Sequence, residues 1–449
     1  MHVRELLRLA PPTIVMRSGS LIMLMVDIVM LGRTSSTELA YYSLAQGPVS
    51  TLMLAALGLQ MGVMIVTAQL FGAGQERLCG GVWRRAVPYA LAIGFGVSLI
   101  CAAGPQAYHW LGQTEDLAVG AAKVTWILGL GIPAYLGYLA SGFFLEGLKR
   151  PWPATWLMLA ANVLNVGLNA WWIDGGAGVP AMGAAGAAWA TTAARWFLCA
   201  AAALWVWNLK DHDRFCIRVK APKDPVGWAW QRRLGYAAGL SIGVEAFGFS
   251  ALNVMAGWFG ATALAAYAIG INILGMVFMI SLGVGSATSV RVGHAVGRRD
   301  PVDAERAGWT GLGLNTLLTA PLVVAFLAVP GAAAGFYTDD PTVLPVAAVL
   351  VAWIAVIVPL DGAQAVMSNA LRGRGEVWMP SLLQSCAYIL VMMPGGWLLG
   401  SRFGWGVEGL FAAILAGSVV SSTLLSTRFR LLALRDRRSS LRTPVTDTL

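Results

Sequence analysis

The chain has 449 residues, of which 57% are hydrophobic and only 12% are charged. Soluble globular domains carry about 25% charged residues, so this composition excludes a soluble protein. The formal net charge of +9 does not indicate a nucleic-acid partner, because most of the basic residues lie in alternate segments between long apolar runs.

Apolar runs of about 20 residues match the thickness of a bilayer, and they are continuous, unlike the alternating strands of a membrane barrel. Reading these runs between charged breaks predicts twelve helices. In chain order they span 13–31, 41–71, 86–104, 117–145, 152–174, 183–207, 234–259, 264–290, 307–330, 343–371, 378–400 and 406–433. We therefore expect an all-α polytopic membrane protein.

The polar stretches divide the predicted helices into two sets of six. We expect an N-terminal lobe over 1–207, a cytoplasmic connector over 208–233 and a C-terminal lobe over 234–434. Residues 435–449 are expected to form a disordered cytoplasmic tail. The N-terminus shows no cleavable signal peptide, and the cysteines have no paired spacing that would indicate disulfides or a metal cluster.

The basic residues follow the predicted helix count. They concentrate before the first helix, in every second loop, in the connector and after the last helix. The positive-inside rule therefore places both termini in the cytoplasm. Both termini on one side and six spans in each half are consistent with the same count of twelve.

The two halves are related in sequence. A shift of 225 positions aligns Val29–Leu44 with Val254–Ile269, Leu57-Gly58 with Leu282-Gly283, and Gly72 with Gly297. Because six is an even number, both copies enter the membrane in the same direction. The predicted fold is two parallel six-helix pseudo-repeats around a central cleft that opens alternately to each side.

Three carboxylates lie inside predicted spans, namely Asp27, Glu245 and Asp361. An acid at the centre of a span costs about 2.5–3.5 kcal/mol, so such residues usually bind something or face a cavity. A neutralised or ion-paired acid that serves packing is the alternative for each of them. The 225-residue shift places Leu252, Ser20 and Leu136 at the equivalent positions. Because the acids are absent from the other copy, we interpret them as ion- or proton-coupling residues.

Polar neighbours extend these three positions. Asn162, Asn165 and Asn169 form a stripe on one predicted helix, and Gln364 lies on the same face as Asp361. We predict that Asp27, Asn165, Asn169, Asn253, Asn272 and Gln364 bind substrate. Gln46 and Tyr388 are further candidates for the lining, while Arg195 is interpreted as structural, either as an internal counter-ion or as a side chain that snorkels to the interface. Interhelical hydrogen bonding is the alternative role for the asparagines.

Several segments together resemble the multidrug and toxic compound extrusion (MATE) family, in particular its NorM-type branch. They are VDIVMLGR from Val26, GLQMGVMIVTAQLFGAG from Gly58, NVLNVGLNAWWIDGGAGVPAMGAAGAAWAT from Asn162, GVEAFGF from Gly243, SVRVGHAVGRRD from Ser289 and PLDGAQAVMSNALRG from Pro359. The resemblance implies an antiporter that exports organic cations in exchange for H⁺ or Na⁺, with functional acids at Asp27, Glu245 and Asp361. NorM-type members often carry a tyrosine one turn before the last of these acids, and this chain has Ile357 there.

From the resemblance we expect a multi-pass protein of the bacterial inner membrane, monomeric, with organic cations as substrates. It would need no cofactor beyond the coupling ion, and Glu245 and Asp361 would hold that ion if it is Na⁺. No nucleotide-binding P-loop or catalytic motif is present in the sequence, so neither an ATP-driven pump nor an enzyme is expected. A flippase for lipid-linked or polar-headgroup substrates remains the alternative function. A membrane receptor or channel that does not carry out coupled transport is a third possible function.

Overall fold

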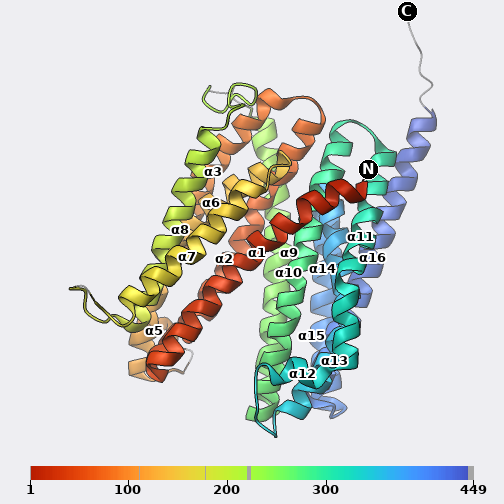
Figure 1. The fold of residues 1–449 in the computed structure, drawn as a ribbon. Helices are drawn as coiled ribbons and strands as arrows, with labels where there is room; N and C mark the ends of the chain where they lie inside the picture. The colour runs from red at the N-terminus through yellow and green to blue at the C-terminus, as the bar shows by residue number, and fades with distance from the viewer. Residues whose placement is uncertain (1, 111, 177, 220–223, 443–449) are drawn as a thin grey trace, which may run out of the picture. The chain divides into compact units, whose positions relative to one another are not determined.

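The computed structural model describes residues 2–110, 112–176, 178–219 and 224–442, and nearly all of them are helical (Figure 1). Within these residues, ten helical segments are long and apolar enough to cross a membrane, which supports the predicted membrane fold. The two other predicted spans are the helices α7 (Trp152–Trp172) and α8 (Gly183–Trp207). The apolar sequence of α7 is interrupted by three asparagines and that of α8 by one arginine.

The contacts within the chain define two compact units. The first-half unit contains residues 15–71 and 75–239, and the second-half unit contains residues 1–14, 72–74 and 240–449. The connector therefore belongs to the first-half unit, together with the beginning of the following helix. The last helix extends to Arg442, so residues 435–442 are helical where a disordered tail was predicted, and residues 443–449 lie outside the described residues.

The first-half unit holds the helices of the first repeat. They are α1 (His2–Thr34) from Val15 onward, α2 (Ser36–Gly72), α3 (Glu76–Cys101), α4 (Pro105–Trp110), α5 (Glu115–Leu130), α6 (Ile132–Gly147), α7 and α8. The single span predicted over 117–145 is divided into α5 and α6 at Gly131, just before Pro133, whose ring favours the first turn of a new helix. The helices α7 and α8 run side by side (Figure 1).

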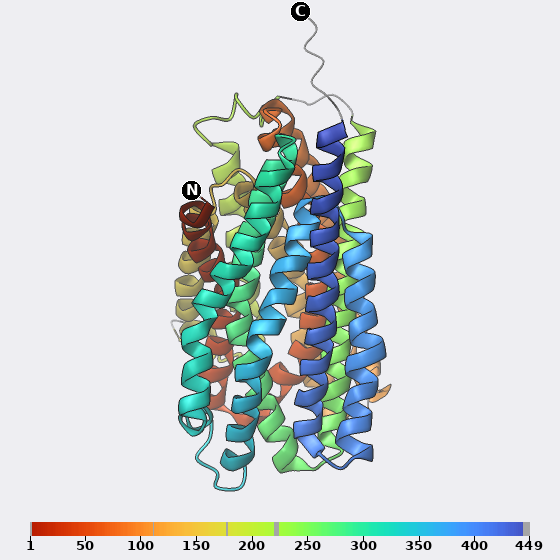
Figure 2. The same ribbon diagram turned by 90° about the vertical axis from the view of Figure 1, so that its right-hand side faces the viewer.

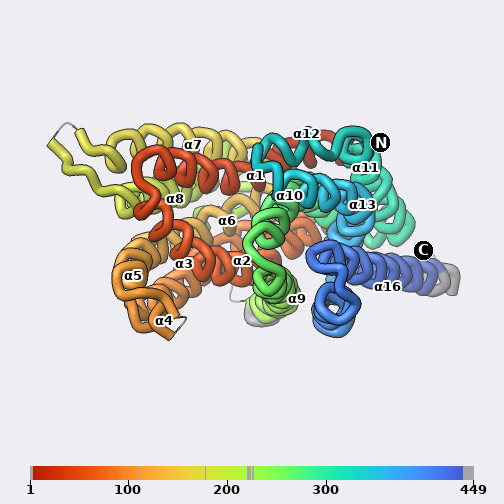
Figure 3. Tube along the Cα trace, turned by 90° about the horizontal axis from the view of Figure 1, so that it is seen from below, coloured from red at the N-terminus to blue at the C-terminus, as the bar shows by residue number. Residues whose placement is uncertain are grey.

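The second-half unit is organised around α13. Its elements are α9 (Pro225–Gly257) from Leu240 onward, α10 (Ala261–Gly297), α11 (Pro301–Ala328), α12 (Pro330–Gly335), α13 (Leu344–Gly373), α14 (Trp378–Cys386), η1 (Ala387–Met392), α15 (Met393–Gly396), η2 (Trp397–Arg402) and α16 (Gly406–Arg442). The helix α13 packs against α10, α11 and α16, as the side view and the view along the helices show (Figures 2 and 3). The segments η1 and η2 are π-helical turns, a feature often found at functional sites.

The repeat recurs in the packing of the first helix of each half. The helix α1 passes from one unit to the other after Ile14, and α9 does so after Gly239, which is the equivalent position at the 225-residue shift. Gly58 of α2 packs against Gly239, and a Cβ added to Gly58 would lie 2.5 Å from the Cα of Gly239. Gly283 of α10 is the equivalent of Gly58 in the second repeat. It packs against Ile14, and a Cβ added to Gly283 would lie 2.9 Å from the backbone nitrogen of Ile14. The beginning of α1 therefore packs in the second-half unit, and the beginning of α9 packs in the first-half unit.

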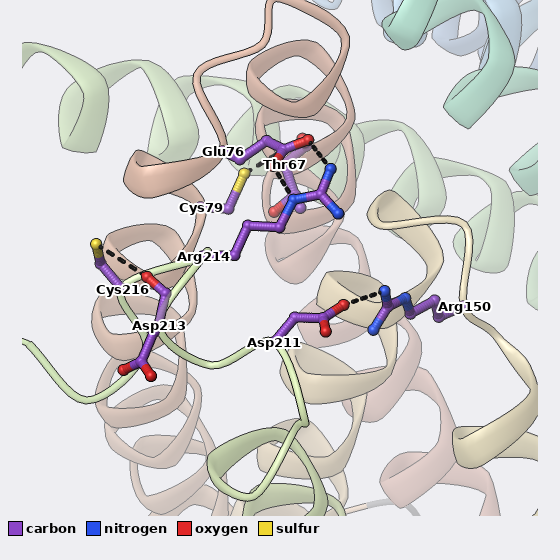
Figure 4. A network of polar contacts seen from close by, with 8 residues as sticks. All are labelled: Thr67, Glu76, Cys79, Arg150, Asp211, Asp213, Arg214 and Cys216. Carbon is purple, nitrogen blue, oxygen red and sulfur yellow. Dashed lines mark hydrogen bonds and ion pairs between the residues drawn. The ribbon is translucent and has the colours of Figure 1, made fainter.

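Ion pairs hold the connector to the rest of the first-half unit (Figure 4), together with one buried aromatic ring. Arg214 pairs with Glu76, and Arg150 donates to Asp211 over 2.5 Å, a hydrogen bond that lowers the pKa of that carboxyl. Phe215 is fully buried, and the Arg150 guanidinium lies 5.8 Å from the centre of its ring. Residues 209–217 are therefore an ordered part of this unit.

Candidate functional site

Asp27 lies at the centre of a buried hydrogen-bond network in the first-half unit. Its Oδ2 atom accepts from the Tyr42 hydroxyl at 2.5 Å and from the Thr191 hydroxyl at 2.6 Å. Its Oδ1 atom accepts from the amides of Asn169 at 2.6 Å and Asn165 at 3.2 Å. Asp27 is fully buried, so these contacts replace the water that would otherwise solvate the carboxylate.

The network draws on four helices, α1, α2, α7 and α8, which carry Asp27, Tyr42, the asparagines and Thr191 within the described part of the chain. Asn165 and Asn169 are one turn apart on α7, so both amides reach the same carboxylate. The third asparagine of the predicted stripe, Asn162, donates instead to the Met158 carbonyl of its own helix over 2.9 Å. The structure thus brings Asn165 and Asn169, but not Asn162, to Asp27.

Arg195 lies one turn beyond Thr191 on α8 and is 6% exposed. Its guanidinium donates to the Leu128 carbonyl over 3.3 Å and lies 5.6 Å from the centre of the Tyr135 ring. It also interacts electrostatically with Tyr42 and Asp27. These contacts place Arg195 next to the Asp27 network, and within the described residues the two side chains do not form a direct ion pair.

The second-half unit brings Glu245 and Asp361 together. Asp361 on α13 is 4% exposed and accepts from the Ser418 hydroxyl of α16 at 3.4 Å. Glu245 on α9 is half-buried and accepts from the Gln384 amide of α14 at 3.2 Å. The two carboxylates are close enough to interact electrostatically. Pro359 lies within α13 two residues before Asp361, where it removes a helical hydrogen bond.

Tyr388 links the residues around these two acids. It lies in the π-helical turn η1, and its hydroxyl hydrogen-bonds with Glu245. The Gln364 amide donates to the same hydroxyl over 2.5 Å, so the predicted polar face of α13 reaches the Glu245 side of the cluster. Ile357 belongs to the surrounding apolar core, and the phenol of this site therefore comes from η1 instead of from the turn before Asp361.

Two predicted substrate-binding residues lie apart from both carboxylate clusters. Asn253 is exposed, because eight residues along a helix rotate a side chain by about 80° away from Glu245. Asn272 is also exposed, and its amide donates to the Ala268 carbonyl of its own helix at 3.1 Å. Within the described residues neither asparagine hydrogen-bonds to an acid, and the role of the two in binding substrate stays a prediction.

Several partners of the acids were not predicted from the sequence, namely Tyr42, Thr191, Gln384 and Ser418. All of them are polar residues on helices other than those that carry the acids. Single hydroxyls and amides in apolar helices carry little signal by themselves. Thr191 is the exception, because Arg195 lies four residues later and a charged residue in an apolar helix marks the face on which both lie.

Both clusters offer oxygen atoms to a cation. In addition to the carboxylates, Asn169 Oδ1 and Gln364 Oε1 are buried and lack a hydrogen-bond partner within the described residues. Carbonyl and carboxylate oxygens are the ligands that hard cations prefer. No group of three or more His, Cys, Asp or Glu side chains that could hold a metal ion occurs in the described part of the chain. The carboxylate and amide oxygens of the two clusters are groups to which protons or hard cations bind.

The sequence profile of the MatE family matches residues 12–171 and 238–398, one segment in each half. A protein of Caulobacter vibrioides described as a probable multidrug resistance protein NorM is 37% identical over 437 residues, covering 97% of this chain and 93% of that protein. Another with the same description, from Bradyrhizobium diazoefficiens, is 32% identical and covers 96% of this chain and 94% of its own length.

Solved structures agree on the fold. A crystal structure of a eukaryotic MATE transporter matches with a TM-score of 0.86 at 18% identity and covers 98% of both chains. A structure titled MATE in the bent conformation matches with a TM-score of 0.88, also at 18% identity, over 97% of this chain and 96% of that chain. The match of the profile to both halves and the full-length relatives lead to one conclusion: the chain belongs to the MatE family of multidrug efflux transporters.

Proposed function

We propose that this protein is a secondary active antiporter that exports organic cations in exchange for H⁺ or Na⁺ by alternating access. The observation that carries the proposal is the pair of buried carboxylate clusters, one around Asp27 and one formed by Glu245 and Asp361. The relatives described as multidrug resistance proteins support the same substrate class.

Buried carboxylates suit an exchange of cations. In a medium of low dielectric constant the attraction between a carboxylate and a cation is much stronger than in water. A carboxylate that holds a proton or a sodium ion loses that attraction for an organic cation. Competition at Asp27, Glu245 and Asp361 would therefore couple the entry of the ion to the exit of the substrate, with the unpartnered amide oxygens as additional ligands.

The bacterial relatives and the membrane spans support a place in the inner membrane. We propose that both termini are cytoplasmic, on the strength of the basic residues in alternate loops. We further propose that the protein works as a monomer and that the coupling ion is all it requires besides its substrate, because each cluster is built from residues of one unit of this chain.

The flippase alternative predicts a basic cavity that receives a pyrophosphate group. The side chains that hydrogen-bond to Asp27, Glu245 and Asp361 are amides and hydroxyls, and one arginine lies beside each cluster, Arg195 and Arg372. The three carboxylates outnumber these two arginines. This composition favours a cationic substrate over an anionic one.

The test is ethidium transport in inverted vesicles that contain the protein, with either a pH gradient or a sodium gradient imposed. We expect one of the two gradients to drive accumulation of ethidium, and an ionophore that dissipates that gradient to stop it. Vesicles without the protein are the control. Absence of transport under both gradients would contradict the proposal, and transport of a lipid-linked sugar instead would support the flippase.

A further inference from the structure

A buried arginine lies close to the acid cluster of the second-half unit. Arg372, one residue before the end of α13, belongs by sequence to the basic segments that the positive-inside rule predicts to be cytoplasmic. In the structure, however, it is only 4% exposed. Its guanidinium donates to the Ser241 hydroxyl of α9 over 2.7 Å.

This contact places a positive charge one helical turn from Glu245, because Ser241 and Glu245 are four residues apart on α9. A second set of contacts joins the same helices. The Ser368 hydroxyl, one turn before Arg372, donates to Gln384 Oε1 over 3.3 Å, and the Gln384 amide donates to Glu245 over 3.2 Å. Polar side chains therefore continue from Glu245 toward the Gly373 end of α13, and Arg372 lies at the end of that series.

We propose that Arg372 is a positioning residue of the Glu245 site, which limits how tightly an organic cation is held there. This inference rests on the proposed function. The guanidinium, fixed by Ser241, repels a cation bound at Glu245 and a cation that would move from Glu245 along Ser368 and Gln384. It thereby promotes release of the substrate and opposes a leak of cations toward the Gly373 end of α13.

The electrostatic contact between Arg372 and Glu245 supports this role. The direction of the effect follows from charge alone, because removal of a nearby positive charge makes a site more attractive to cations. Arg374, two residues further along, offers a matched comparison. It is also largely buried, but it pairs with Asp436 and lies 5.5 Å from the centre of the Phe429 ring.

The experiment measures the equilibrium binding of ethidium to the purified full-length protein by fluorescence polarisation. We expect R372Q to bind ethidium about tenfold more tightly than the wild type, the size of an ordinary interaction between two charges in a partly solvated site. R372K should bind like the wild type because it keeps the charge. S241A, which removes the hydrogen bond that the guanidinium donates to Ser241, should shift the affinity in the same direction as R372Q, and R374Q should leave it unchanged.

A double-mutant cycle separates an action through Glu245 from a general structural effect. In an E245Q background, the R372Q substitution should no longer increase the affinity for ethidium. Equal affinities of the wild type and R372Q, or the same increase in both backgrounds, would overturn the inference while the proposed function stands. If E245Q binds ethidium as well as the wild type does, the assignment of Glu245 in the proposed function fails instead.

Discussion

Tyrosines at equivalent positions of the two repeats have opposite surroundings. Tyr42 and Tyr267 are 225 residues apart, and both are almost fully buried. The hydroxyl of Tyr42 donates to Asp27, whereas the hydroxyl of Tyr267 is buried and has no hydrogen-bond partner among the described residues. Leu252 occupies the position in the second repeat that Asp27 occupies in the first. The Tyr267 hydroxyl therefore has no carboxylate at the position equivalent to Asp27.

This asymmetry predicts opposite effects of the same substitution. Y42F removes a hydrogen bond to a carboxylate, which contributes about 1.5–3 kcal/mol, so we expect slower ethidium efflux. Y267F removes a hydroxyl whose burial without a partner costs about 1–3 kcal/mol, so we expect unchanged efflux and an equal or higher thermal stability in detergent. Efflux assays and melting curves of the two variants check both expectations. Equal losses of efflux in the two variants would show that the phenol of Tyr42 has no special role at Asp27.

At the scale of elements, close contacts between glycines define how α2 meets the beginning of α9 in the first-half unit. Gly58 and Gly62 on α2 and Gly235 and Gly239 on α9 are each separated by four residues, a spacing that allows helix backbones to approach closely in membranes. An added Cβ at Gly62 would lie 2.1 Å from the Gln231 carbonyl oxygen, and one at Gly235 would lie 2.2 Å from the Leu59 carbonyl oxygen. No side chain fits at these contacts unless the helices move apart.

We therefore predict that G62A destabilises the protein by about 1–3 kcal/mol, the usual cost of overpacking. The matched control is G96A in α3, where an added Cβ meets no atom within 4 Å. There the loss of backbone freedom in the unfolded chain should stabilise the protein by about 0.5–1 kcal/mol. Thermal unfolding in detergent distinguishes the two variants, and an equally stable G62A would contradict the close packing of α2 on α9.

The connector is the second element with a specific anchor. Phe215 is fully buried, its carbonyl accepts from Gly80 N at 2.9 Å, and Arg150 and Arg214 flank its ring. We predict that F215A reduces the local stability of residues 209–217 by about 3–5 kcal/mol, as is usual for the loss of a buried ring. Hydrogen exchange measured by mass spectrometry should show faster exchange in this segment. V219A, at a position that is 58% exposed, should leave the exchange unchanged.

The ion pair between Arg150 and Asp211 adds a dependence on pH to the same segment. The pKa of Asp211 is lowered in the folded protein, mainly by the hydrogen bond from Arg150. The pair therefore stabilises the connector above the usual pKa of an aspartate, and this stabilisation is lost as the pH falls through the lowered value. We therefore expect residues 209–217 to be well protected from hydrogen exchange at neutral pH and less protected in acid, when the rate at each pH is compared with the intrinsic rate of an unstructured peptide at that pH.

At the scale of the whole molecule, the fold class, the positions of the membrane spans and the repeat could be predicted from the sequence, because apolar runs and loop charges report directly on membrane spans. Several helices extend well beyond the predicted bounds, such as α1, α3 and α9, which begin at His2, Glu76 and Pro225, because their ends continue past the apolar runs. The side chains that complete the acid clusters could not. Tyr42, Thr191 and Ser418 reach the acids from other helices, and which face of an almost wholly apolar helix turns inward is not visible in its hydrophobic pattern. The burial of Arg372 could not be predicted either, because the sequence pattern places this arginine in a cytoplasmic loop.

The proposed exchange requires both clusters in each transport cycle, and this requirement predicts strong non-additivity. D27N and D361N each replace a buried carboxylate by an amide of nearly the same volume, so we expect the protein to fold and coupled ethidium efflux to fall to a small but measurable rate in either variant. If both acids act in one cycle, the D27N/D361N double variant should lose no more than the more impaired single variant, as residues that act as a unit do.

Initial rates of ethidium efflux in cells that contain equal amounts of each variant give the comparison. E408Q is the control for a lost carboxylate, because Glu408 lies exposed in the first turn of α16. It should transport like the wild type. Rate losses that multiply in the double variant would mean that each cluster supports its own transport process, and full efflux by D361N would remove Asp361 from the ion pathway. Non-additive losses would instead show that the acids of two different units, placed asymmetrically in a symmetric repeat, serve one exchange reaction.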